Sequence, residues 1–93
     1  MPDENQRLHA LVSGRVQGVN YRYYTMLAAN EIGLDGWVRN QIEGTVEVVA
    51  EGPRSRLERL VIFLYRGPSS ARVQDVDVEW EAATGEFDGF IIR

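Results

Sequence analysis

The seven residues from Asp75 to Glu81 alternate strictly between acidic and apolar side chains, and this pattern constrains the fold more than any other. Successive side chains of a strand point to opposite faces of its sheet, so one face of this strand meets water and the other is apolar. A sheet with one dry face needs other elements to cover it. We therefore expect helices that share this sheet as a common wall.

Two segments have apolar residues at helical spacing, residues 21–32 and residues 54–66. Gly33 is placed to end the first helix as a left-handed cap, and Gly67-Pro68 stops the second. The predicted apolar face of the first contains Tyr21, Tyr24, Thr25, Ala28 and Ile32, and that of the second contains Leu57, Leu60, Val61 and Leu64.

Alternation also predicts strands at residues 8–13, 36–40 and 45–50, and a short last strand from Phe87 to Ile92. Glu43-Gly44 provides the turn of a hairpin between the second and third strands. The order β-α-β-β-α-β, with an extra C-terminal strand, predicts an α+β ferredoxin-like sandwich in which two helices cover one face of an antiparallel sheet. We expect one domain at residues 7–93, preceded by an N-terminal extension at residues 1–6.

The composition excludes several kinds of chemistry. The chain has no cysteine, which rules out a thiolate nucleophile and a cysteine-rich zinc site. All ten basic residues are arginines, which rules out a Walker A phosphate loop and a Schiff-base lysine. His9 is the only histidine, so a site with several histidine ligands is also impossible.

The net charge of −4 argues against a nucleic-acid partner bound through a broad basic face. Between Glu4 and Glu31, however, the sequence has three arginines, Arg7, Arg15 and Arg22, and no acid. The longest apolar run is too short to span a bilayer, and the first residues are acidic where a signal peptide is basic. We therefore expect a cytoplasmic protein without a membrane partner.

A loop bounded by Gly14 and Gly18 joins the first strand to the first helix. Backbone amides without intrahelical partners and the positive end of the helix dipole meet at such a place, which favours an anion. Arg22 lies where the helix begins and can add a guanidinium fork that matches a phosphate. The glycines alone are also consistent with a loop that only shapes a turn.

Residues 14–22, GRVQGVNYR, closely resemble the signature of the acylphosphatase family, and residues 36–40, GWVRN, followed by EGTVE at 43–47, resemble its second signature. Residues 67–73 and 90–93 are similar to later landmarks of the family, so the resemblance covers nearly the whole chain. Two small departures are Tyr21, where phenylalanine is commoner, and Glu43, where aspartate is commoner.

The resemblance implies hydrolysis of the carboxyl-phosphate bond of a small acyl phosphate without a metal, and we expect no other cofactor. The small size and acidic surface predict a monomer. The resemblance assigns Arg22 to the substrate phosphoryl group and Asn40 to orienting the attacking water. It implies a phosphate cradle made of the backbone amides of Arg15, Val16, Gln17, Gly18, Val19 and Asn20.

Three other functions stay open at this point. A non-catalytic ferredoxin-like module can bind an anion or small ligand with the same loop, but such a module has no need of Asn40. An RNA-binding sheet requires exposed aromatic and basic residues, whereas the last long strand presents acids. The domain can also form part of a larger maturation protein.

Overall fold

The computed structural model describes residues 4–93, and the elements within this range follow the predicted order. They are β1 (Asn5–Arg15), α1 (Tyr21–Ile32), β2 (Asp35–Asn40), β3 (Val46–Pro53), α2 (Arg54–Arg66), β4 (Arg72–Ala82) and β5 (Phe90–Ile92). Asn5 and Gln6, which the sequence analysis places in the N-terminal extension, pair with β3 as part of β1. Glu4 precedes β1 and is exposed, and residues 1–3 of the expected extension lie outside the described residues.

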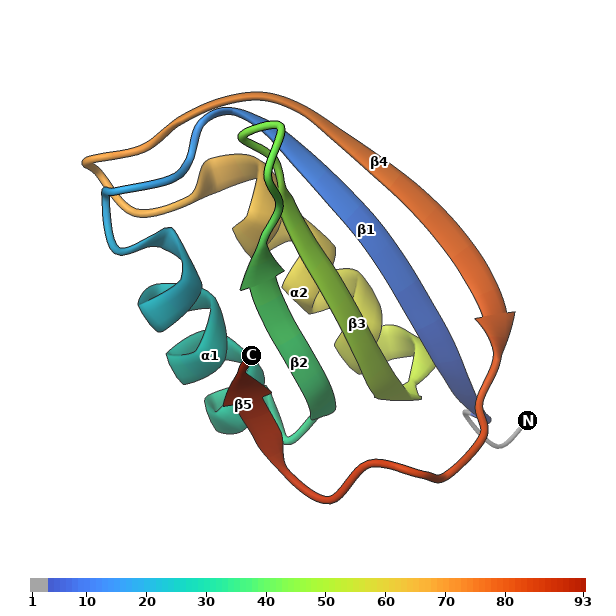
Figure 1. The fold of residues 1–93 in the computed structure, drawn as a ribbon. Coiled ribbons are helices and arrows are strands. Elements are labelled where there is room, and N and C mark those ends of the chain that lie inside the picture. The colour runs from blue at the N-terminus through green and yellow to red at the C-terminus, as the bar shows by residue number, and fades with distance from the viewer. Residues whose placement is uncertain (1–3) are drawn as a thin grey trace.

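The strands form one sheet in the order β4-β1-β3-β2-β5 (Figure 1). The first four are antiparallel to their neighbours, as predicted. The added strand β5 runs parallel to β2, with Val38 opposite Ile92, so the sheet is mixed. This direction follows from the path of residues 83–89, which carry the chain from β4 at one edge of the sheet to the opposite edge (Figure 1).

Strand β5 begins at Phe90, three residues later than the predicted start at Phe87. Gly89 has a positive φ of 84°, which departs from extended backbone, and its carbonyl accepts a hydrogen bond of 2.9 Å from the amide of Gly36. Because the chain reaches β2 only at this point, the ladder cannot start earlier.

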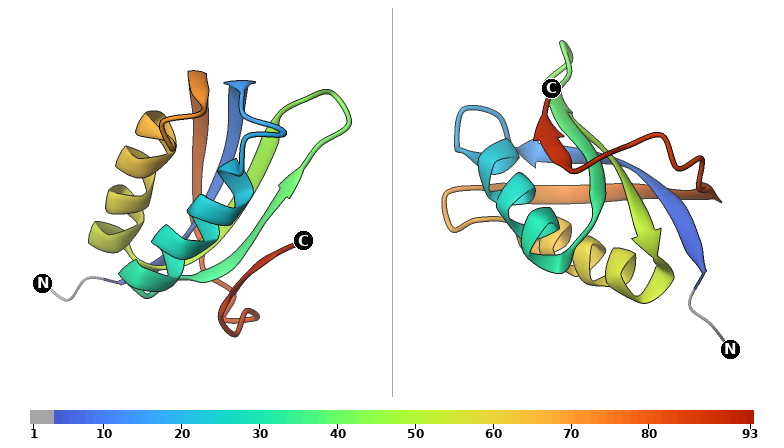
Figure 2. Two further views of the ribbon diagram at one scale, coloured as in Figure 1. Left: turned by 90° about the vertical axis from the view of Figure 1, so that its left-hand side faces the viewer. Right: turned by 90° about the horizontal axis from the view of Figure 1, so that it is seen from below.

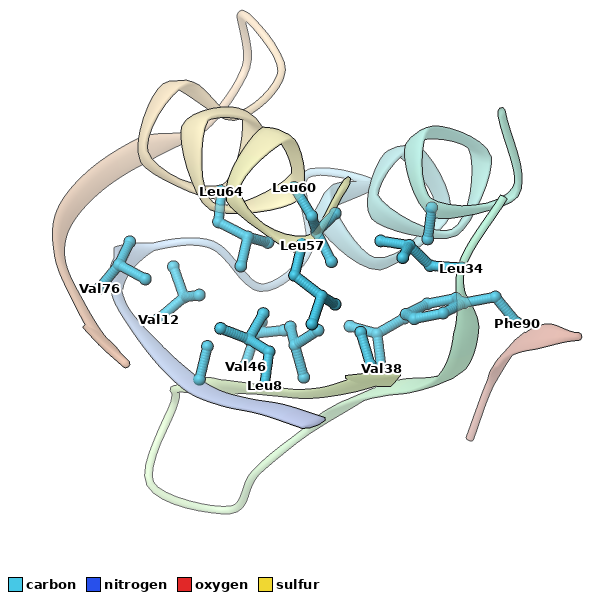
Figure 3. Packing of buried hydrophobic residues seen from close by; sticks show 14 of the residues in the cluster. Leu8, Val12, Leu34, Val38, Val46, Leu57, Leu60, Leu64, Val76 and Phe90 are labelled. Carbon is cyan, nitrogen blue, oxygen red and sulfur yellow. The ribbon is translucent and has the colours of Figure 1, made fainter. Parts of the chain in front are cut away.

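Helices α1 and α2 lie side by side on one face of the sheet and bury its apolar residues (Figures 2 and 3). Fully buried side chains include Leu8, Ala10, Val12, Val38, Val46 and Val48 from the sheet and Leu57, Leu60 and Leu64 from α2. In α1 the buried residues are Tyr21, Thr25 and Ala29, whereas Tyr24, predicted to face the core, is exposed. Neither helix has the length and apolar sequence needed to cross a membrane.

The opposite face of the sheet carries charges. Asp75, Asp77, Glu79 and Glu81 of the edge strand β4 are exposed, as the alternation predicts. Glu51 of β3 lies on the same face but is only 5% exposed. Its carboxylate accepts hydrogen bonds from Arg7 Nε at 2.7 Å and from the amides of Thr84 and Gly85 at 2.9 and 3.0 Å. Glu51 therefore fastens the connection between β4 and β5 to the sheet.

These contacts decide the ionisation of Glu51. Burial by itself raises the pKa of a carboxyl group, but the hydrogen bonds from Thr84, Arg7 and Gly85 outweigh burial and lower the pKa of Glu51 below its ordinary 4.5. A carboxylate with a lowered pKa stabilises the fold above its ordinary pKa, and this stabilisation is lost as the pH falls through the lowered value.

Replacing this carboxylate tests its contribution. We expect Glu51→Gln to lower the free energy of unfolding at neutral pH by about 1–3 kcal/mol, because charged hydrogen bonds become neutral ones. The difference from wild type should shrink as the pH falls from 4.5 through the lowered pKa of Glu51, below which the folded wild-type carboxylate is protonated as well. Denaturant unfolding across this range measures it, with Glu81→Gln on the same face as the exposed control. A difference that did not change with pH would contradict the assignment.

Candidate active site

The loop after β1 has a backbone that only certain residues adopt. The ladder between β1 and β4 shifts register between Ser13 and Gly14, and a Cβ on Gly14 would lie 2.2 Å from the carbonyl oxygen of Arg72. Gly18 and Asn20 have positive φ values of 74° and 63°. Glycine and asparagine tolerate this region better than other residues, so the sequence suits a tightly curved loop.

The amides of this loop and of the first turn of α1 have no acceptor among residues 4–93. The first helical bond runs from the amide of Tyr24 to the carbonyl of Asn20 at 3.1 Å, which leaves the preceding amides without intrahelical acceptors. Among residues 4–93, no hydrogen bond uses the amides of residues 16–20. The first turn contains no acidic residue, and the Asn20 side chain makes no capping bond. This helix terminus therefore favours an anion.

A hollow of about 240 Å³ opens at this loop. The loop lies at the same end of the sheet as the β2–β3 hairpin (Figure 1). The residues that line the hollow are Val16, Gly18, Asn20, Tyr21, Arg22, Tyr23, Asn40 and Ile92. The structure thus brings Arg22 and Asn40, predicted from two separate motifs, to one place.

The other predicted cradle residues lie around the hollow without lining it. Arg15 is exposed and ends β1 opposite Arg72, so the free part of the loop starts at Val16. Val19 packs against the core, and its carbonyl accepts a bond of 2.8 Å from the hydroxyl of Ser70. The side chain of Gln17 points to the hairpin instead.

Arg22 and Asn40 both have unused bonding capacity. Among the described residues, Arg22 has no carboxylate within salt-bridge distance, in contrast to Arg7, Arg39 and Arg54. Asn40 is the last residue of β2, and its Oδ1 is buried without a hydrogen-bond partner in residues 4–93. Because buried polar atoms are normally paired, this oxygen marks a place for a donor such as water. Arg22 and Asn40 therefore line one small space, and each has a polar group that no partner in residues 4–93 satisfies.

Gln17 joins the loop to the segment after Asn40. Its Nε2 donates to the carbonyls of Gln41 at 2.7 Å and Thr45 at 2.8 Å. Sequence reasoning treated Gln17 as a loop residue that contributes only its amide, and no local pattern indicates this bond across 24 residues. The side chain fixes the distance between the two halves of the site.

The structure adds to what the sequence predicts for three further residues. Tyr21, which stands where phenylalanine is commoner, is buried, and its hydroxyl donates to the carbonyl of Leu64 at 2.7 Å. Burial raises the pKa of Tyr21. Tyr23 and Ile92, to which the sequence analysis assigns no role in the site, both line the hollow. In the sequence, the only indication that Tyr23 lies at the site is its position next to Arg22.

A larger hollow of about 480 Å³ lies elsewhere, beside the connection between β4 and β5, and contains none of the predicted site residues. It is lined in part by Arg7, Trp37, Phe87 and Ile91. Arg7 is already engaged by Glu51 and Glu86 and is stacked on Phe87, and no backbone amides of a helix start converge there. Within residues 4–93, no group of three or more acidic or histidine side chains is arranged to hold a metal ion.

Comparison with known proteins gives consistent results. A sequence model of the family described as Acylphosphatase matches residues 8–92. The acylphosphatase of Roseiflexus sp. (strain RS-1) is 54% identical over 86 residues, which cover 92% of each chain. The crystal structure of acylphosphatase from Bacillus subtilis has a TM-score of 0.91 and 34% identity, covering 95% of this chain and 98% of that chain. The structure of an acylphosphatase from Coxiella burnetii has a TM-score of 0.89 and 38% identity, covering 96% and 93%.

The bridge made by Gln17 is open to a direct test. We expect Gln17→Ala to lower the free energy of unfolding by about 1–2 kcal/mol, because two carbonyls lose a side-chain donor. Exchange of the hydrogen-bonded hairpin amides of Gln41 and Gly44 should also become faster. Gln74→Ala, at an exposed glutamine of β4, is the matched control. Equal stability and exchange in the two variants would contradict the bridging role.

Proposed function

Because the chain belongs to the acylphosphatase family, whose members hydrolyse acyl phosphates, we propose that Arg22, Asn40 and the amides of residues 16–20 perform this hydrolysis in the hollow of about 240 Å³. The observation that carries the proposal is that a guanidinium without a counterion, a buried free acceptor and the unpaired amides all border this one hollow. The relatives' shared name favours the enzyme over a non-catalytic anion-binding module.

The phosphoryl group occupies the loop end of the hollow. Its oxygens accept hydrogen bonds from the amides of residues 16–20 and from the guanidinium of Arg22, and the helix dipole adds a favourable field. Transfer of a phosphoryl group passes through a loose transition state with negative charge on the equatorial oxygens. Donors that are already in place stabilise that charge without reorganisation, so this end supplies the electrostatic part of catalysis.

Asn40 holds the attacking water. Its buried Oδ1 accepts a hydrogen bond from the water, and this bond orients a lone pair of the water oxygen toward phosphorus. Since Gln17 fixes the hairpin against the loop, the water and the phosphoryl group are held at a constant separation.

The leaving group explains why the site needs no general acid. Water forms a bond to phosphorus as the bond from phosphorus to the acyl oxygen breaks, and a carboxylate leaves with that electron pair. A carboxylate is a stable anion at neutral pH and requires no proton. The water's proton passes to an oxygen of the substrate phosphate, because neither Arg22 nor Asn40 can accept it. A hydrolysis rate that did not follow the protonation state of the substrate would contradict this last step.

The cytoplasmic location, the monomeric state, and the lack of a nucleic-acid partner, a membrane partner or a cofactor stay predictions.

Arg22 is tested by removing the guanidinium. We expect Arg22→Ala to lower kcat/KM for benzoyl phosphate at least ~100-fold, because charged hydrogen bonds to the phosphoryl group are lost. The assay follows ultraviolet absorbance with a chelator present, and inorganic phosphate is added as a competitive inhibitor. Arg59→Ala, at an exposed arginine of α2, is the control. Arg22→Ala with the activity of this control would rule out the assignment.

Asn40 is expected to act on the chemical step. Asn40→Ala should lower kcat while the inhibition constant for inorganic phosphate stays close to the wild-type value, because water is misplaced but the anion contacts remain. The same absorbance assay gives both quantities. If Asn40→Ala lowered kcat and also abolished inhibition by inorganic phosphate, Asn40 would bind the phosphoryl group instead of orienting the water.

A further inference from the structure

Three residues of the hollow, Tyr21, Tyr23 and Ile92, have no part in the proposed chemistry, and Tyr21 is buried. Tyr23 and Ile92 line it together with the phosphoryl-binding residues, and their exposed fractions are 49% and 38%. Neither side chain is charged, and both offer a large apolar surface. The hollow therefore has a polar end at the loop and an apolar boundary where α1 and β5 approach each other.

The backbone holds Ile92 firmly beside the strand that carries Asn40. Ile92 is opposite Val38 in the parallel ladder, and the amide of Arg93 donates to the carbonyl of Val38 at 2.8 Å. Asn40 is two residues beyond Val38 on the same strand. At the other end of β5, the amide of Gly36 donates to the carbonyl of Gly89 at 2.9 Å, so the short strand is fixed on both sides.

Alternation along β5 decides which isoleucine reaches the site. Phe90 is buried on the helix-covered face, and Ile92, two residues later, is on that same side. Ile91 lines the larger hollow with Trp37 instead. The two isoleucines are thus adjacent in sequence and border different spaces.

Helix α1 brings Tyr23 to the same boundary. The Asn30 side chain of this helix donates to the carbonyl of Phe90 at 3.3 Å, which ties α1 to β5. Tyr23 follows Arg22 directly, and its ring makes an edge contact with Tyr24 at a centroid distance of 5.5 Å. This contact restricts the orientation of the ring beside the phosphoryl site.

We propose that Tyr23 and Ile92 form an acyl-binding wall that favours acyl phosphates with an apolar or aromatic acyl group over those with a short one. The proposal rests on the proposed function. With the phosphoryl group at the loop, an acyl group that extends toward α1 and β5 covers both side chains and removes apolar surface from water. A short acyl group covers little of this surface and gains less from it.

The test compares benzoyl phosphate with acetyl phosphate. We expect Ile92→Ala and Tyr23→Ala each to lower the ratio of kcat/KM for benzoyl phosphate to that for acetyl phosphate about 10-fold, as for other losses of apolar contact in a specificity pocket. Ile91→Ala, which removes the same atoms from the neighbouring residue, should keep the wild-type ratio. An unchanged ratio in either variant overturns the assignment for that residue.

Two further measurements separate a misfolded variant, or a wrong proposed function, from a wrong acyl-binding wall. If Ile92→Ala weakens the fold, Ile92→Thr retains the branched shape that suits a strand and still replaces apolar surface. Circular dichroism and inhibition by inorganic phosphate show whether each variant is folded with an intact loop. If folded wild-type protein hydrolysed neither substrate, or Arg22→Ala kept full activity toward both, the proposed function would fail rather than the acyl-binding wall.

Discussion

The apolar face that the sheet shares with both helices determines where every polar part of the site lies. Val16 and Tyr21, at the two ends of the loop after β1, are each only 1% exposed and anchor it in this core. Between them the chain has to reverse within a few residues, and Gly18 and Asn20 allow the positive φ values that this requires. The core thus fixes both ends of a tightly curved loop whose amides make no hydrogen bond among residues 4–93.

The arginines of the protein show how the site is kept ready for an anion. Arg7, Arg39 and Arg54 each contact a glutamate, and such pairs satisfy both charges. Arg22 has no such partner among the described residues. Arg15, Arg56, Arg59, Arg66, Arg72 and Arg93 also lack a carboxylate partner there, but only Arg22 lines the hollow at the loop. A guanidinium that is not compensated internally can give its full interaction to a substrate, while the paired arginines organise the surface.

Periodicity predicted the helices and most of the sheet, because those features are encoded within short segments, whereas the meeting of Arg22 and Asn40 was expected only from the resemblance to the acylphosphatase family. Contacts between distant segments were missed. The bonds of Gln17 to the hairpin and the place of Ile92 beside Val38 depend on how strands pair, which local patterns do not specify. The exposure of Tyr24 shows a related limit, since helical spacing marks the edge of an apolar face only approximately.

The acidic row of β4 also affects how two copies of the protein meet. An edge strand of eleven residues has unpaired backbone groups that can template pairing with another chain. If two such edges approached each other, Asp75, Asp77, Glu79 and Glu81 of one copy would face the same acids of the other, and like charges opposite each other destabilise a ladder. At the other edge, β5 has only three residues, too few to nucleate growth. The charge pattern that reveals the strand in the sequence therefore also disfavours pairing between the β4 edges of two copies.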